Sequence, residues 1–304
     1  MIELVYSAKV TAAQAAGTPV VALESTIITH GMPYPQNLSV ARDVEDTVRK
    51  AGAVPATIAV LDGNFHIGLD PAQLEALAKS KGVAKLSRAD IAACIATGGT
   101  GATTVAATMI GARLAGIEVF ATGGIGGVHR GAEADFDISA DLHELAQTPV
   151  TVVAAGAKAI LDVPKTLEVL ETLGVPVITF GQDAFPAFWS GQSDLPSPLR
   201  MDSAVDIARA HRVRAKMGLP GGQLVANPVP RHAEIPAEIL RPMIQRALND
   251  ADQHNITGKD VTPYLLQRVY ELTEGRSLDA NIALVVNNAR LGAKVAQELQ
   301  KIEQ

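Results

Sequence analysis

The chain has 304 residues and a formal net charge of −6, a length at which one α/β domain over residues 1–304 is expected rather than two. Its 26 basic and 32 acidic residues form no lysine- or arginine-rich tract, which argues against nucleic-acid binding and favours a small-molecule substrate. The single cysteine, Cys94, excludes an internal disulfide, and neither a signal peptide nor an apolar run of about 18 residues is visible, so we expect a cytoplasmic protein that does not enter a membrane.

The predicted elements alternate between strand and helix along the chain. Apolar runs predict strands at residues 20–23, 55–61, 117–121, 150–154 and 175–179, with another within 221–228. Helices are predicted over 40–51, from Asp70 onward, over 203–217 and through most of the tail after 235. Asn37 or Ser39 is the expected cap of the first of these helices. This alternation implies crossover connections and a mostly parallel sheet.

Two glycine clusters are candidates for phosphate binding. Residues 97–104 lead into a helix-like segment, and residues 121–131 directly follow a predicted strand. Backbone amides in such turns can converge on an anion, but tight strand-to-helix turns would explain the same glycines. Neither cluster has the spacing of a dinucleotide-binding or Walker loop. His129 and Arg130 favour an anion site at the second cluster.

The segment 134–141 carries three aspartates. Asp135 and Asp137 would share one face of a strand, whereas Asp137 and Asp141 would share one face of a helix. Carboxylates this close repel one another unless a cation or hydrogen bonds compensate, and a hard divalent ion is one solution. A solvated turn with a capping aspartate is the alternative.

Two further residues sit where α/β enzymes place ligands, at the ends of predicted strands. Lys158 follows strand 150–154, and partial burial would free its amine as a nucleophile, although a lysine on a first helical turn is the commoner arrangement. Glu24 ends the strand 20–23, where apolar surroundings would raise its pKa and suit a general acid, or where it simply lies at the surface. Lys85 is either an anion contact or solvated.

A long loop is predicted over residues 185–198, which contain the only tryptophan, Trp189. The loop is interpreted either as a lid over the site or as a surface excursion.

The motifs together resemble a known family. Residues 21–37 closely resemble the opening motif of the pseudouridine-5′-phosphate glycosidases. Further similar segments are residues 52–58, 120–132, 136–142, 155–158, 226–228 and 287–289, together with Asn281. The resemblance extends from about residue 19 to the C-terminal helix and is weakest over 180–200.

This resemblance implies a three-layer α/β/α sandwich around a largely parallel or mixed sheet, assembled as a homotrimer. It implies reversible cleavage of the carbon–carbon bond of pseudouridine 5′-phosphate to uracil and ribose 5-phosphate, with a divalent metal, most often Mn²⁺. Lys158 would be the nucleophile and Glu24 the proton donor. The remaining roles implied by the resemblance are substrate contacts for Lys85, Val105 (through its backbone), Ser139, Ala140 and Asp141, pocket positions for His129 and Asn281, and metal ligation by Asp137.

The residues suit this chemistry, because a C-glycoside offers no leaving oxygen to protonate and the two-carboxylate route gains little. Lys158 would attack the anomeric carbon while Glu24 protonates the ring oxygen, and an open-chain iminium would act as the electron sink for expelling uracil. Three alternatives stay open: the same site acting on another C- or N-ribosyl phosphate, as in relatives tied to pigment biosynthesis, a non-catalytic sugar-phosphate-binding protein, and a Schiff-base aldolase.

Overall fold

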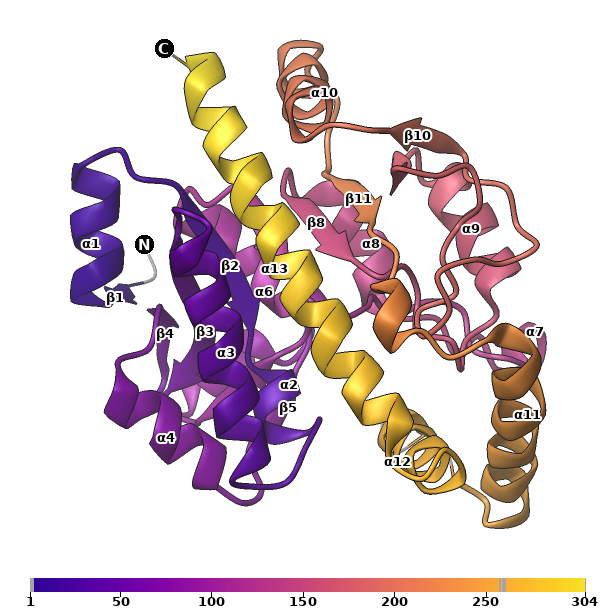
Figure 1. Cartoon of the computed structure of the whole chain (residues 1–304). Helices are drawn as coiled ribbons and strands as arrows, with labels where there is room; N and C mark the ends of the chain where they lie inside the picture. The colour runs from indigo at the N-terminus through magenta and orange to yellow at the C-terminus, as the bar shows by residue number, and fades with distance from the viewer. Residues whose placement is uncertain (1–2, 257, 259–260, 304) are drawn as a thin grey trace.

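Strands and helices alternate through the computed structural model, which describes residues 3–256, 258 and 261–303 (Figure 1). The strands are β1 (Leu4–Tyr6), β2 (Val20–Glu24), β3 (Val54–Leu61), β4 (Asn64–Ile67), β5 (Ala84–Leu86), β6 (Gly101–Thr103), β7 (Val119–Ala121), β8 (Thr151–Ala154), β9 (Val177–Phe180), β10 (Leu199–Met201) and β11 (Gln223–Ala226). The larger helices are α1 (Ala8–Ala15), α3 (Gln36–Lys50), α4 (Pro71–Lys79), α6 (Val105–Leu114), α8 (Ala140–Gln147), α9 (Val163–Thr172), α10 (Ala204–Lys216), α11 (Ala237–Gln253), α12 (Val261–Leu272) and α13 (Arg276–Glu303). Shorter helical segments are α2 (Thr26–Thr29), α5 (Ile91–Ala96), α7 (Ala132–Asp135) and a 3-10 turn, Arg231–Ala233.

In the described residues, eleven strands form one sheet, whose main path runs β1-β4-β3-β2-β7-β8-β11-β9-β10. Neighbouring strands along this path are parallel except for β3 and β4, which form an antiparallel hairpin. Asp62 and Gly63 connect that hairpin with φ angles of 49° and 74°, the left-handed conformation that a tight two-residue turn requires. β6 branches off antiparallel to β3 and carries β5. The expected largely parallel or mixed sheet is confirmed.

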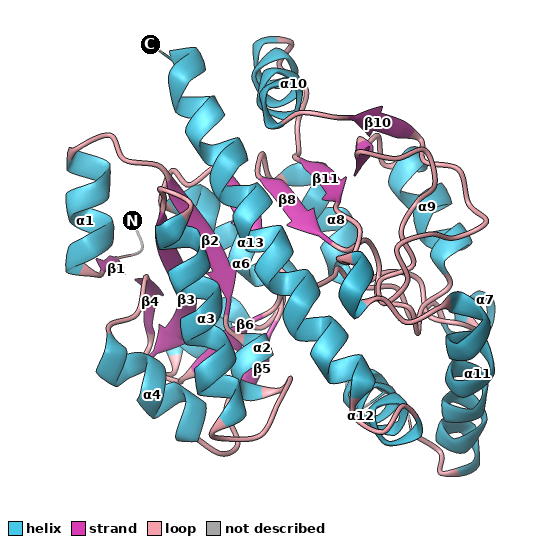
Figure 2. Ribbon diagram, in the orientation of Figure 1, coloured by secondary structure: helices cyan, strands magenta, loops and turns pink. Residues whose placement is uncertain are grey.

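Helices cover both faces of the sheet (Figures 1 and 2). The long helix α13 crosses one face over β2, β7 and β8, and packs against α3 and α10. α6 covers β2, β3 and β7 from the other face and contacts α8, which in turn contacts α9. Gly292 allows α13 to approach β7 closely, because a Cβ atom there would lie 3.2 Å from the Cβ of Ala121. The three-layer α/β/α arrangement is confirmed.

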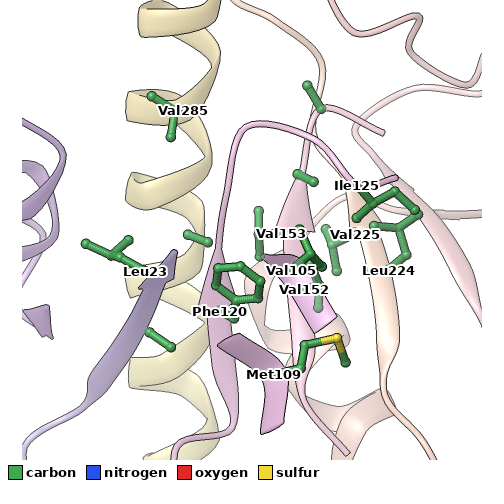
Figure 3. Packing of buried hydrophobic residues seen from close by; sticks show 14 of the residues in the cluster. Leu23, Val105, Met109, Phe120, Ile125, Val152, Val153, Leu224, Val225 and Val285 are labelled. Atoms are coloured by element: carbon green, nitrogen blue, oxygen red, sulfur yellow. The ribbon is translucent and has the colours of Figure 1, made fainter. Parts of the chain in front are cut away.

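The core lies between the sheet and these two helix layers (Figure 3). Phe120, Val152 and Val225 are completely buried on adjacent strands, and Met109 of α6 is equally buried. Aliphatic side chains dominate this core, as strands covered on both faces require. The core holds the central strands β2, β7, β8 and β11 in fixed register, so that their carboxyl ends form one rigid edge.

For the predicted helices and strands, the type of element is confirmed more often than its exact first and last residues. Asp70 caps α4 in a capping box with Gln73, and Ser203 caps α10. The helix predicted over 40–51 starts earlier, at Gln36, and neither proposed residue caps it. Asn37 is instead buried, with its amide donating to Ile28 O at 2.8 Å and Ala78 O at 2.9 Å. Its side chain ties α2 and α4 together because tertiary contacts outweigh the cap preference.

The loop predicted over 185–198 is confirmed as a loop, between β9 and β10, but it is not a surface excursion. Phe185, Phe188 and Trp189 are all buried, with Trp189 at 0% exposure. The main chain of Trp189 accepts a 2.9 Å hydrogen bond from Ile235 N, and Gly191 N donates to the Glu234 carboxylate at 2.8 Å. Aromatic side chains anchor this part of the loop as a fixed wall.

Candidate active site

The candidate site begins at the carboxyl ends of three adjacent parallel strands. Glu24 is the last residue of β2, Thr122 follows β7, and Lys158 follows β8. Because β7 lies between β2 and β8 and is parallel to both, these three chain segments leave the sheet at the same edge. This is the edge at which open α/β sheets bind their ligands.

A cavity of about 570 Å³ opens at this edge. Glu24, Lys85, Lys158 and Asn281 all line it, so the structure brings together four of the residues predicted from the sequence. Its other lining residues are Thr26, Ile27, Thr29, His30, Gly31, Met32, Pro33, Gln36, Gly123, Gly124, Phe188, Thr262, Pro263, Leu266, Gln267, Tyr270, Ser277, Leu278 and Leu284. The strand ends contribute charged side chains to the cavity, and the wall formed by α12 and α13 combines apolar residues such as Leu266, Leu278 and Leu284 with polar ones.

Hydroxyl groups hold both carboxylate oxygens of Glu24. Thr122 donates to Oε1 at 2.5 Å, and Thr26 donates to Oε2 at 2.7 Å. Thr122 is itself buried, and its carbonyl accepts a 2.8 Å hydrogen bond from the amide of Asn288 on α13. Asn288 in turn accepts from Asn227, which follows β11. This buried chain of hydrogen bonds fixes the direction in which Glu24 faces the cavity.

Lys158 lies in the loop between β8 and α9, five residues before that helix begins, and so is not on a first helical turn. Its main-chain N–H donates to Ile125 O at 3.2 Å, which ties it to the glycine-rich segment after β7. Gly156 has a φ of +86° and would bring a Cβ atom within 2.9 Å of the Phe185 ring. Packing on both sides therefore fixes the backbone from which the lysine reaches the cavity.

His129 lies in the electrostatic field of the same lysines. Burial lowers its pKa below the ordinary value, and the charges of Lys158 and Lys85 act in the same direction, while Asp137 and Asp135 oppose them. The imidazole lies 3.8 Å from a carboxylate oxygen of Asp137. His129 borders the lysine cluster but is not among the residues that line the cavity.

A second histidine, His30, lines the cavity although the sequence interpretation gave it no role. Burial lowers the pKa of His30, and the charge of Lys85 lowers it further. Its Nδ1 is hydrogen bonded to the Thr29 hydroxyl at 2.6 Å. The sequence could have indicated a role for His30, because this residue lies inside the motif of residues 21–37, six positions after Glu24.

The predicted geometry of the three aspartates is wrong. Asp135 ends the short helix α7, Asp137 lies in the following loop, and Asp141 is in the first turn of α8, so no pair shares a strand or a helix face as expected. The cause is the pairing of 137–139 with the glycine-rich segment: His129 N donates to Asp137 O, and Ser139 N donates to Gly127 O. Asp135 accepts from Asp137 N at 3.0 Å, which makes this segment a turn.

Ser139, Ala140, Asp141 and Val105 are gathered beside the glycine-rich segment rather than in the cavity lining. The Asp141 carboxylate is buried and accepts from Ala106 N at 2.9 Å and Gly126 N at 2.8 Å. It therefore neutralises the N-terminus of α6 and fixes the loop that continues from the cavity residues Gly123 and Gly124. The predicted substrate contacts of these four residues stay predictions.

The first glycine cluster, residues 97–104, does not line the cavity. The Thr103 hydroxyl is buried and donates to Ile58 O at 2.7 Å, and Thr104 caps the N-terminus of α6. Its turn and β6 explain the glycines: at Gly101 a Cβ atom would lie 2.5 Å from the Leu86 side chain. Of the two clusters, the second is the one at the candidate site.

Within the described residues, no group of three or more His, Cys, Asp or Glu side chains is arranged to hold a metal ion. The same part of the chain contains no helix with the length and apolarity needed to cross a membrane.

Comparison with known proteins places the chain in a family. Residues 9–298 match the model of the indigoidine synthase A like proteins. The chain is 74% identical over 298 residues to a protein of Roseobacter denitrificans named pseudouridine-5′-phosphate glycosidase, covering 98% of this chain and 96% of that one.

Solved structures agree with the sequence match. The crystal structure of the prealnumycin C-glycosynthase AlnA in complex with ribulose 5-phosphate superposes with a TM-score of 0.91 at 39% identity, over 99% of this chain and 98% of that one. An indigoidine synthase A-like protein from Thermotoga maritima gives a TM-score of 0.89 at 33% identity, over 98% and 97% of the two chains. The chain therefore belongs to the indigoidine synthase A like family and, within it, to the pseudouridine-5′-phosphate glycosidases.

Proposed function

We propose that the chain reversibly cleaves the carbon–carbon glycosidic bond of pseudouridine 5′-phosphate, giving uracil and ribose 5-phosphate, through a Schiff base on Lys158. The observation that carries the proposal is the meeting of Glu24 and Lys158 in one cavity with Lys85 and Asn281. Relatives between 58% and 74% identical that bear the name pseudouridine-5′-phosphate glycosidase support the choice of substrate.

Lys158 and Glu24 have separate roles in the proposed reaction, as nucleophile and as proton donor. Lys158, once deprotonated, attacks C1′ of the ribose, forming the carbon–nitrogen bond as the bond from C1′ to the ring oxygen breaks. Glu24 supplies the proton that the ring oxygen takes up, and its fixed orientation between Thr26 and Thr122 suits that transfer. The nitrogen lone pair then forms the iminium while the uracil carbon takes a proton and leaves. Water hydrolyses the iminium and releases ribose 5-phosphate.

Lys85 and the glycine-rich segment supply the anion-binding part of the proposed site. Lys85 is on β5 and lines the cavity, and Gly123 and Gly124 bring main chain to the same wall. These cations suit a phosphate group, since the charge of Lys85 lowers the pKa of both His30 and His129, and the charge of Lys158 lowers the pKa of His129.

The proposal is tested by trapping. We expect Lys158→Ala to abolish uracil release and also to abolish the covalent adduct that borohydride forms between the protein and ribose 5-phosphate, because the only proposed nucleophile is gone. Mass spectrometry maps the modified residue in the wild type, and Lys165→Ala is the matched control, since Lys165 lies nearby on α9 and pairs with Glu133 and Asp162. An adduct that survives in Lys158→Ala removes Lys158 from the nucleophile role.

We also propose that a divalent metal, most often Mn²⁺ in this family, acts at Asp137. The Asp137 side chain is 39% exposed and lies 3.8 Å from the His129 ring, whereas the Asp135 carboxylate accepts a hydrogen bond from the Asp137 main chain. One carboxylate fits a hard cation that keeps several waters and is completed by substrate oxygens, rather than a cage made of protein alone. Such an ion would supply charge that orients the substrate oxygens.

Metal removal gives the corresponding prediction. Chelation with EDTA should reduce uracil release by at least about tenfold, and added Mn²⁺ should restore it, because the ion orients the substrate. Asp137→Asn should weaken Mn²⁺ binding measured directly by electron paramagnetic resonance, whereas Asp183→Asn, at an exposed side chain that pairs with Arg200, should leave it unchanged. Equal binding by Asp137→Asn would show that this carboxylate is not the ligand.

A second function is favoured by one specific observation. The structure of the C-glycosynthase AlnA matches over nearly the whole chain, which suits a site that makes or breaks a ribosyl carbon–carbon bond to another ring. Uracil release compared with product release from other C- and N-ribosyl phosphates separates the two. We propose finally that the chain acts as a homotrimer.

A further inference from the structure

The single tryptophan of the chain is connected to the cavity through Asn281. Trp189 is fully buried, and its indole Nε1 donates to Asn281 Oδ1 at 2.7 Å. An indole N–H is a donor only, so the amide atom that faces it has to be the oxygen. The NH₂ group of Asn281 is therefore turned away from the indole, and Asn281, not Trp189, is the residue of this pair that lines the cavity.

The tryptophan is held too firmly to follow the amide if it rotates. Its carbonyl accepts from Ile235 N at 2.9 Å, and the next residue, Ser190, donates its hydroxyl to Ile235 O. Its ring packs edge-on against Phe188, with centroids 5.1 Å apart. Phe188 lines the cavity and reaches Gly124 so closely that a Cβ atom there would lie 2.5 Å from the ring.

The surroundings of Asn281 fit a flat heterocycle. Leu278 and Leu284 lie three residues to either side on α13 and line the same cavity. Leu266 and Tyr270 face the cavity from α12. A planar ring between these apolar groups would meet one fixed amide donor at its edge. A ring carbonyl oxygen satisfies that donor, whereas a ring amino group leaves two donors facing each other without an acceptor.

We propose that Trp189 is a positioning residue: by holding the oxygen of the Asn281 amide, it presents the NH₂ group to the base and makes the site select a ring carbonyl over a ring amino group. This inference rests on the proposed function and deepens it, because it names what the base subsite recognises. Uracil carries such carbonyl oxygens, and cytosine replaces one of them by an amino group.

The test uses the synthesis direction with ribose 5-phosphate and either uracil or cytosine. Trp189→Phe frees the amide to rotate, so the preference for uracil over cytosine in kcat/KM should fall about five- to tenfold. The change should appear in KM for the base, with KM for ribose 5-phosphate unchanged. Phe65→Leu is the control for lost core volume, since Phe65 is buried on β4 away from the cavity, and it should keep the wild-type preference.

A double-mutant cycle separates positioning from general destabilisation. If Trp189 acts through the amide, Trp189→Phe should have no further effect on base preference in an Asn281→Ala background. The inference is overturned if Trp189→Phe keeps the wild-type preference, or if it lowers the preference equally with and without Asn281.

The proposed function is assayed separately, by uracil release from pseudouridine 5′-phosphate. If the wild type releases uracil but Trp189→Phe keeps the wild-type preference for uracil over cytosine, only the inference about Trp189 is overturned. If the wild type releases no uracil, the proposed function is overturned. The inference about Trp189 is then tested alone by titrating the wild type with uracil and with cytosine and monitoring the fluorescence of its single tryptophan. Equal affinity for the two bases in that titration overturns it.

Discussion

At the scale of single residues, the proposed proton donor depends on groups that the reaction itself does not consume. Thr26 and Thr122 each donate a hydroxyl to a different oxygen of Glu24. They come from segments far apart in sequence, one just after β2 and one just after β7, and meet only because these strands are neighbours. The carboxylate is therefore positioned partly by its own segment, through Thr26, and partly by the pairing of strands, which brings Thr122 to it.

Thr122→Val tests this positioning. We expect kcat for uracil release to fall about ten- to hundredfold, because a misdirected carboxylate transfers its proton poorly even when substrate still binds. KM should change much less. Thr122→Ser keeps the hydroxyl and should recover most of kcat, and the two variants are compared by steady-state kinetics. Equal losses in the serine and valine variants would point to packing rather than to the hydrogen bond.

At the scale of elements, an ion pair links helix α10 to Glu118, the residue that directly precedes β7. Glu118 accepts from both terminal nitrogens of Arg212, and the ring of His211 lies 3.3 Å from the same carboxylate. Burial alone would raise the pKa of Glu118, but the hydrogen bonds from His211 and Arg212 outweigh it and lower the pKa from 4.5 to about 2. The folded state therefore favours the ionised carboxylate.

This shift gives a prediction about stability and pH. A carboxyl whose pKa is lower in the folded state contributes stability that is fully present above the unfolded value of about 4.5 and is lost as the pH falls toward 2. Because the side chain is 37% exposed, solvent screening leaves about 1–2 kcal/mol. Glu118→Gln should lower the free energy of unfolding by that amount at pH 7 and by progressively less below pH 4.5. Urea unfolding of the wild type and of Glu118→Gln across this pH range measures the difference in free energy of unfolding. A difference that does not change with pH would contradict the lowered pKa of Glu118.

At the scale of the whole molecule, Phe136 exposes its aromatic ring to solvent next to the aspartates of the candidate site. Phe136 is 78% exposed and has a φ of 58°, a left-handed conformation that a bulky residue adopts at a cost. It stands between Asp135 and Asp137, and Ile138 is also exposed. An apolar pair presented this way fits a contact with a neighbouring subunit of the proposed homotrimer.

Phe136→Asp should therefore weaken the assembly. We expect sedimentation velocity to show a shift from trimer toward monomer at micromolar concentration, because a charge replaces an apolar contact. Phe136→Leu keeps the apolar surface and serves as the control. A trimer of unchanged stability in the aspartate variant would place the interface elsewhere.

Much of the fold could be predicted from the chain because its signals are local. Apolar runs predicted strands at 20–23, 55–61 and 150–154, each within one residue of the observed bounds, and Asp70 and Ser203 cap helices with their own side chains. The predictions that failed concern residues whose hydrogen-bond partners belong to other segments of the chain. Asn37 does not cap a helix because its side chain makes buried hydrogen bonds to α2 and α4. Asp135 and Asp137 form a turn because residues 137–139 pair with the glycine-rich segment.

The sequence by itself determined the kind of protein and its candidate chemical groups. It indicated an α/β chain with Glu24 and Lys158 at the ends of predicted strands and Lys85 as a candidate anion contact, with motifs that resemble one family. Only the tertiary structure decided which of these groups share a cavity, that His30 joins them, and that Trp189 is buried behind Asn281. The physical reason is that strand ends and caps follow from residues close along the chain. The neighbours across a cavity are set by the order of strands in the sheet, which brings together segments more than a hundred residues apart.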